Sequence, residues 1–125
     1  MAKLLVVDDE VSLCRLLKDT FGKGGHEADA VTSGQGAKEK IDSHTYDLVI
    51  TDIRMPDVTG LELLEHARAI KSRARFVLMT AVPTLTTAIQ AVNLGAYRYV
   101  IKSESFVEEL VSVVEGALKE NALRQ

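Results

Sequence analysis

Short, nearly unbroken apolar runs recur along the chain, and each is followed by a segment whose apolar residues have helical spacing. Such runs are typical of strands that helices cover on both faces, and repeated strand–helix units build parallel sheets. We therefore expect an α/β fold with a five-stranded parallel sheet. Its strands are expected at residues 4–7, 27–31, 48–50, 76–79 and 97–101, the second and fifth at the edges.

Five helices are expected between and after these strands. The first carries Leu13, Leu16, Leu17 and Phe21 at helical spacing and stops at the glycine cluster of residues 22–25. The run Ser105–Glu108 has the pattern of a capping box at the start of the last helix. The other three helices are expected at residues 36–43, 61–70 and 84–94.

Length and composition limit the function classes. With 125 residues, 46% of them apolar and 26% charged, the chain suits one domain spanning residues 1–125. A net charge of −3 argues against direct binding of nucleic acid. Acidic residues interrupt the first apolar run at once, which excludes a signal peptide or membrane span there and predicts a cytoplasmic protein. Residues 119–125 are either a plain C-terminus or the start of a linker.

The residues that follow four of the strands are chemically distinctive. Asp8 and Asp9 end the first strand, Asp52 the third, Thr80 the fourth and Lys102 the fifth. With strand order 2-1-3-4-5, Asp52 lies on the central strand, about 5 Å from each neighbouring strand, and the long Lys102 side chain has about 10 Å to cover. We therefore expect these side chains to meet at one edge of the sheet.

Three carboxylates at one edge repel one another, and a hard divalent cation offsets their charge. Mg²⁺ suits one or two carboxylates plus a phosphate oxygen better than Ca²⁺ does. Asp52 is then the best-placed nucleophile for a phosphoryl group. A single aspartate at a strand end is more often a turn or cap residue, but four such features at four strand ends favour the reactive site.

The remaining metal-binding and thiol side chains suggest no second site. His26, His44 and His66 are too scattered for a shared zinc site and are expected to face solvent or lie in loops. The single cysteine, Cys14, falls among leucines and is expected in the core.

Several segments closely resemble the response-regulator receiver family, and the match covers essentially all 125 residues. They are Leu5–Glu10, Asp47–Pro56 with Gly60, Thr80–Ala81, and Gly95–Ala96 followed by Tyr99 and Lys102. The resemblance implies a flavodoxin-like (βα)5 three-layer sandwich. It also implies a phosphoacceptor that dephosphorylates itself slowly and is not otherwise an enzyme.

By this resemblance Asp52 accepts the phosphoryl group, and Mg²⁺ is held by Asp8, Asp9, Asp52 and the backbone carbonyl of Arg54. Thr80 and Lys102 would bind the phosphoryl oxygens. The implied partners are a histidine kinase as phosphodonor and an output domain or target protein, with a phosphorylation-dependent homodimer as an alternative. The run from Met55 to Glu62 looks most like receivers of nitrogen-regulation type, which usually precede an ATPase and a DNA-binding domain.

One residue departs from the family pattern. Proline usually follows the lysine in a cis peptide, whereas here Ser103 follows Lys102. A cis bond before a residue other than proline costs about 2.5–4 kcal/mol, so we expect a trans bond or a rearranged loop. Ser103 is expected to help Ser105 cap the last helix.

The family couples phosphorylation to movement of a threonine and an aromatic residue, positions held here by Thr80 and Tyr99. Tyr99 is equally suited to simple packing on an edge strand. The readout surface is expected on the fourth helix, fifth strand and fifth helix, where Ala88, Val92 and Tyr97 are candidates. Burial within the domain is the favoured alternative for Ala88 and Val92.

Two other functions use similar residues. A phosphatase of the haloacid-dehalogenase type also has an aspartate nucleophile, but it normally carries a second aspartate two positions on, where this chain has Arg54. A receiver-like interaction module that no longer takes phosphate is suggested only by Ser103.

Overall fold

The five strands form one parallel sheet in the order β2-β1-β3-β4-β5, as expected. The computed structural model describes residues 2–124, and side chains are described for residues 2–120. The strands are β1 (Lys3–Val7), β2 (Glu27–Val31), β3 (Leu48–Asp52), β4 (Arg75–Thr80) and β5 (Arg98–Ile101). The helices are α1 (Val11–Lys23), α2 (Gly34–Ser43), α3 (Gly60–Ala69), α4 (Leu85–Asn93) and α5 (Phe106–Arg124).

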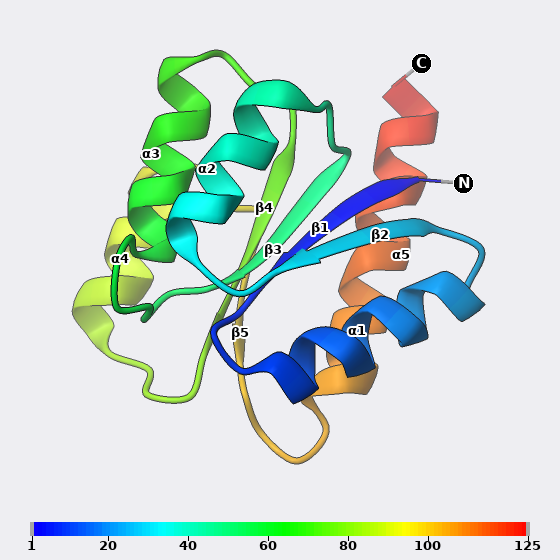
Figure 1. The fold of residues 1–125 in the computed structure, drawn as a ribbon, viewed down its shortest axis with the longest axis horizontal. Helices are drawn as coiled ribbons and strands as arrows, with labels where there is room; N and C mark the ends of the chain where they lie inside the picture. The colour runs from blue at the N-terminus through cyan, green and yellow to red at the C-terminus, as the bar shows by residue number, and fades with distance from the viewer. Residues whose placement is uncertain (1, 125) are drawn as a thin grey trace.

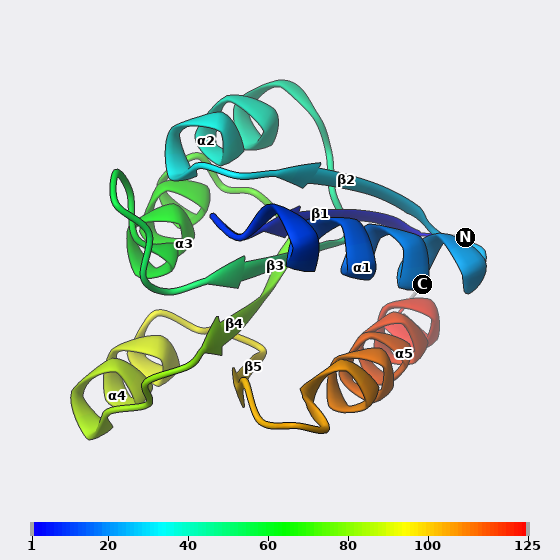
Figure 2. The ribbon, with the colours of Figure 1, turned by 60° about the horizontal axis from the view of Figure 1, so that its bottom comes forward.

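Helices cover both faces of the sheet, which gives the expected three layers. α1 and α5 lie on one face, and α2, α3 and α4 lie on the other (Figures 1 and 2). Side chains of β1 alternate between two cores: Leu4 and Val6 face α1 and α5, whereas Leu5 and Val7 face the opposite helices. Because both faces are buried, most positions of such a strand are apolar, which explains the nearly unbroken apolar runs.

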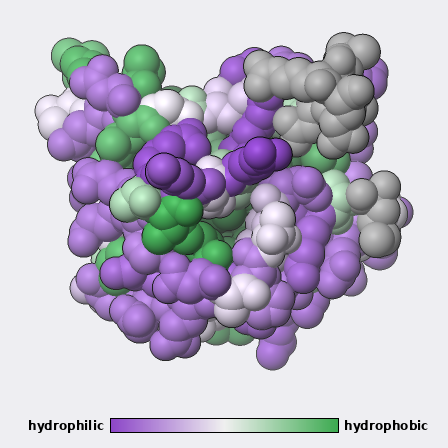
Figure 3. Space-filling model, turned by 90° about the horizontal axis from the view of Figure 1, so that it is seen from above, coloured by the Kyte–Doolittle hydropathy of each residue, from purple (hydrophilic) through white to green (hydrophobic). Residues whose placement is uncertain are grey.

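The surface of the domain differs from these apolar cores. Seen from above the view of Figure 1, it is mainly hydrophilic, with apolar side chains only in patches (Figure 3). Among the described residues, no helix is both long and apolar enough to cross a membrane.

Most helix boundaries follow the expected signals, with one difference at α2. This helix begins at Gly34 rather than residue 36, because the Ser33 side chain accepts a hydrogen bond from Gly36 N and caps an earlier turn. α5 begins at Phe106, and Glu109 N donates to the carbonyl of Ser105. Gln125, the end of the expected linker segment 119–125, lies outside the described residues.

The expected burial of Val92 is wrong: this α4 residue is 75% exposed, and Ala88 is only partly buried. α4 packs on the sheet mainly through Ala91, which is 1% exposed, so its larger apolar side chains turn outward. The exposed face of α4 and β5 therefore carries Leu85, Ile89, Val92 and Ile101.

The histidines lie apart, as expected, but not all face solvent. His44 is exposed. His26 lies in the loop before β2, yet its side chain is only 12% exposed, and Nε2 is 3.9 Å from Glu115 Oε1 of α5. His66 lies on α3, where Nε2 is 2.6 Å from Asp42 Oδ1 at the end of α2.

Candidate functional site

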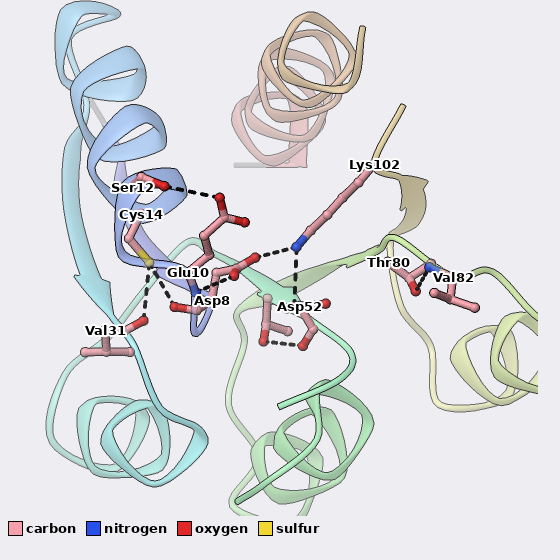
Figure 4. Close-up of polar contacts among 10 residues, drawn as sticks. Asp8, Glu10, Ser12, Cys14, Val31, Asp52, Thr80, Val82 and Lys102 are labelled. Atoms are coloured by element: carbon pink, nitrogen blue, oxygen red, sulfur yellow. Dashed lines mark hydrogen bonds and ion pairs between the residues drawn. The ribbon is translucent and has the colours of Figure 1, made fainter. Parts of the chain in front are cut away.

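The carboxyl ends of β1, β3 and β5 bring four charged side chains into one pocket: Asp8, Asp9, Asp52 and Lys102. Figure 4 shows Asp8, Asp52 and Lys102 of this group. Parallel pairing aligns Val7 with Thr51 across β1 and β3, so the next residue on each strand falls at the same edge of the sheet. Carboxylate oxygens of Asp8, Asp9 and Asp52 lie within 4.8 Å of one another. The sequence-based expectation that these aspartates meet is therefore confirmed.

Asp8 is the most enclosed member of the pocket. It is 1% exposed, and its Oδ1 accepts a hydrogen bond of 2.9 Å from Glu10 N. Its backbone carbonyl accepts the Cys14 Sγ–H at 3.2 Å, which gives the buried thiol a partner in the core, as expected of Cys14. Asp9, the next residue, is exposed, and its carboxylate still lies within 4.8 Å of those of Asp8 and Asp52.

Lys102 crosses from β5 to the aspartates. Its Nζ is 2.6 Å from Asp8 Oδ2 and 3.3 Å from Asp52 Oδ2, and its side chain is 14% exposed. The extended side chain bridges the intervening strand β4, as its length predicts (Figure 4). One ammonium group thus partly neutralises three carboxylates and leaves two negative charges.

Burial and neighbouring charges shift the pKa values of Asp52 and Lys102. Burial raises the pKa of Asp52, the charge of Asp8 adds to this effect, and Lys102 opposes it. Burial alone would lower the pKa of Lys102, but its contacts with Asp8 and Asp52 outweigh this and raise it. Lys102 therefore stays charged at neutral pH, whereas ionised Asp52 lacks full compensation.

The backbone of Arg54 influences the Asp52 carboxylate. A hydrogen bond from the Arg54 backbone acts to lower the pKa of Asp52, although it does not overcome burial. The Arg54 side chain is exposed, so only its backbone belongs to the site. Gly60, at the start of α3, packs so closely on the Asp52 carbonyl that a Cβ there would clash.

Thr80 lies beside the pocket but does not contact the aspartates. It is 2% exposed, and its Oγ1 accepts a hydrogen bond of 3.1 Å from Val82 N (Figure 4). The hydroxyl can still donate a hydrogen bond, since this contact uses it only as an acceptor.

Tyr99 is held by a residue that the sequence did not reveal. Its hydroxyl lies 2.9 Å from Oγ1 of Thr87 on α4, and the ring is half-buried. This contact depends on how α4 packs against β5, for which Thr87 carries no local signal. Tyr99 therefore both packs its ring in the half-buried space between β5 and α4 and hydrogen-bonds to α4 through its hydroxyl.

The Lys102–Ser103 peptide bond is trans, as expected, since no cis bond occurs between the residues that the structure describes. Ser103 contributes through its backbone, whose carbonyl accepts a hydrogen bond of 3.2 Å from Phe106 N. The chain therefore turns into α5 without displacing Lys102 from the pocket.

Comparison with known proteins identifies the family. Residues 4–115 match the family model described as the response regulator receiver domain. The regulatory protein AtoC of Escherichia coli is 33% identical over 98% of this chain and 26% of its own length. The DNA-binding transcriptional regulator NtrC of Azospirillum brasilense is 36% identical over 96% of this chain and 25% of its length. The chain thus spans about a quarter of these relatives.

Solved structures agree with this assignment. The response regulator TrrA of Thermotoga maritima, in complex with Mg²⁺ and BeF, is 38% identical, has a TM-score of 0.83, and is matched over 94% of this chain and 99% of its own. A CheY-like receiver domain from Methanospirillum hungatei has a TM-score of 0.93 at 24% identity over 100% of this chain and 99% of its own, which shows the shared fold. The chain belongs to the receiver domain family of two-component response regulators.

Proposed function

We propose that this receiver domain accepts a phosphoryl group on Asp52 from a histidine kinase, in a reaction that depends on Mg²⁺. The observation that carries the proposal is the meeting of three carboxylates and one ammonium group at the end of the sheet. Their two uncompensated negative charges match one divalent cation. TrrA, a relative at 38% identity, is described in complex with Mg²⁺ and BeF.

The donor set suits Mg²⁺ and not a softer metal. All the available ligands are oxygens: the carboxylates of Asp8, Asp9 and Asp52, and the backbone carbonyl of Arg54. Bound there, Mg²⁺ would offset charge on the transferring phosphoryl oxygens.

In the proposed transfer, a carboxylate oxygen of Asp52 attacks phosphorus as the phosphorus–nitrogen bond of the kinase phosphohistidine breaks. The bonding electron pair leaves with the imidazole, which takes up a proton, and Asp52 becomes an acyl phosphate. Lys102, already 3.3 Å from Asp52, pairs with one phosphoryl oxygen. The Thr80 hydroxyl turns from Val82 N to donate to another.

Movement of Thr80 is the proposed origin of the switch. Raising an active state from about 1% to about 50% occupancy requires about 2.7 kcal/mol. One or two charge-assisted hydrogen bonds, each contributing about 1.5–3 kcal/mol, provide this. Tyr99 would follow, exchange its contact with Thr87, and alter the surface formed by α4, β5 and α5.

That surface is the proposed contact with the output domain, a target protein or a second copy of the chain. Leu85 and Val92 are 78% and 75% exposed there, which is unusual for large apolar side chains. AtoC and NtrC are described as regulators, NtrC as a DNA-binding one, and both are about four times as long as the matched region. We therefore assign residues 1–125 to one receiver domain, with residues 119–125 leading toward an output domain. We propose that the whole protein is a cytoplasmic regulator of transcription and that this domain itself binds no nucleic acid.

Phosphorylation is tested by intact mass after incubation with acetyl phosphate and Mg²⁺. The wild type should gain the mass of one phosphoryl group, whereas Asp52→Asn should stay unmodified because its amide is a poor nucleophile. Asp47→Asn, which changes an exposed aspartate just before β3, should behave as the wild type. Rapid phosphate release without a lasting adduct would instead indicate a phosphatase, and no adduct at all would indicate a silent module.

The charge balance is tested by unfolding in metal-free buffer. Since the native pKa of Asp52 is raised, protonation of this group stabilises the fold below the unfolded pKa, near 3.8, and that stability is lost as pH rises through the native pKa. Asp52→Asn should therefore increase the free energy of unfolding at pH 7 and have less effect near pH 4. Mg²⁺ at 100 times its Kd should add about 2.7 kcal/mol to the wild type and less to the variant.

The Asp47→Asn control should show neither effect, because Asp47 lies outside the acidic pocket and the asparagine oxygen can still accept the hydrogen bond of 2.8 Å from Lys3 N. A variant Asp52→Asn that is less stable than the wild type at pH 7 without metal would contradict the charge balance.

The switch is tested with Thr80→Ala. This variant should still be phosphorylated but should lose most of the phosphorylation-dependent NMR shifts of α4 and β5, since it lacks the hydroxyl donor. Thr80→Ser, which keeps the hydroxyl, should retain them. If the full set of shifts persisted in Thr80→Ala, Thr80 would not couple the site to Tyr99.

A further inference from the structure

The loop between β3 and α3 is fastened to the start of α2 by Asp57. Its Oδ1 accepts a hydrogen bond of 3.0 Å from Gly34 N, and its Oδ2 accepts one of 2.8 Å from Gln35 N. Both donors lie in the first turn of α2, where helix geometry leaves N–H groups without partners. Hydrogen bonds from Gln35, Val58 and Gly34 hold the pKa of Asp57 below its ordinary value, so it is ionised at neutral pH.

Close steric contact also joins the start of α2 to the loop between β3 and α3. A Cβ at Gly34 would lie 2.5 Å from both Cβ and the carbonyl oxygen of Val58, so only glycine lets α2 approach the loop this closely. Gly34 is buried, although Asp57 itself is exposed. The first turn of α2 and residues 57–58 therefore touch through backbone as well as through the Asp57 carboxylate.

The loop is also fixed at its two ends. Gly60 N donates a hydrogen bond of 2.9 Å to the Ile53 carbonyl, and Gly60 packs on the carbonyl of Asp52. Arg54 lies between Ile53 and Asp57 in the sequence, and its backbone acts to lower the pKa of Asp52. Of the groups proposed to bind Mg²⁺, the Arg54 carbonyl is the only one supplied by this loop, and its place depends on how the loop is held.

We propose that Asp57 is a positioning residue for the metal site, which it does not touch: by holding the loop against α2 it fixes the Arg54 backbone and so strengthens Mg²⁺ binding. This inference rests on the proposed function of the site. Mg²⁺ requires near-ideal octahedral geometry at about 2.0–2.1 Å, so a displaced carbonyl ligand weakens binding. Residues that orient metal ligands from outside typically change metal affinity by about 10–100-fold.

The coupling must act in both directions. If the Asp57 contact strengthens Mg²⁺ binding, Mg²⁺ must strengthen that contact by the same factor. Hydrogen exchange of the Gly34 and Gln35 amides should therefore slow when Mg²⁺ binds, although both amides belong to α2 and neither is a proposed ligand.

Asp57→Ala and Ser33→Ala form a matched pair for the test. Ser33 caps the same helix end through Gly36 N at 3.0 Å but has no hydrogen bond to the β3–α3 loop. Both variants lose a contact at the start of α2, and only Asp57→Ala releases the loop. Asp57→Asn keeps one acceptor oxygen and serves as the conservative variant.

The Mg²⁺ Kd of each protein would be measured by NMR titration, with unfolding curves to confirm folding. We expect Asp57→Ala to bind about tenfold more weakly, Asp57→Asn to fall between, and Ser33→Ala to bind as the wild type. In metal-free protein, the Arg54 amide should exchange faster in Asp57→Ala and not in Ser33→Ala.

An unchanged Kd in Asp57→Ala, or an equal loss in Ser33→Ala, would overturn the inference while leaving the proposed function intact. A wild type that binds no Mg²⁺ would overturn both. These outcomes are distinguishable because titration of the wild type alone shows whether the proposed metal site exists, whereas the variants test only the role of Asp57.

Discussion

The pairing of Lys102 with Asp8 and Asp52 is the interaction on which the site depends. These groups arrive from β5, β1 and β3, and without the lysine three carboxylates would face one another within 4.8 Å. The ammonium group reduces the repulsion but leaves two negative charges. The fold therefore holds an acidic pocket that is incompletely neutralised, and such a pocket favours a divalent cation and a phosphoryl group that binds beside it.

The sheet holds these charged residues in place against their mutual repulsion. Both of its faces are covered, and the cores formed with α1 and α5 and with α2, α3 and α4 fix the strands that carry the charged residues. The loops at the carboxyl ends remain held by specific contacts, such as Asp57 to α2 and Thr80 to Val82. The sheet is therefore rigid, whereas a few hydrogen bonds of the loops can be exchanged. This combination suits a switch, because small changes at the site can select between discrete loop arrangements.

Much of this could be predicted from the sequence. Unbroken apolar runs identified β1, β3 and β4, and weaker patterns identified β2 and β5. Parallel topology brings the ends of the strands together, so Asp8, Asp9, Asp52 and Lys102 were predicted to meet. The exposure of Val92, the burial of His26, and the contacts made by Thr87 and Asp57 were not predicted, because they depend on how helices and loops pack. The earlier start of α2 was missed for a local reason, since the capping serine precedes two glycines that disfavour helix.

The central claim is that the aspartates at the ends of β1 and β3 share one divalent ion. Mn²⁺ takes the same oxygen ligands as Mg²⁺, and its anomalous scattering would locate it in a crystal of the protein. We predict one strong peak bounded by the carboxylates of Asp8, Asp9 and Asp52. A peak elsewhere, or no peak in this pocket at saturating Mn²⁺, would contradict the account.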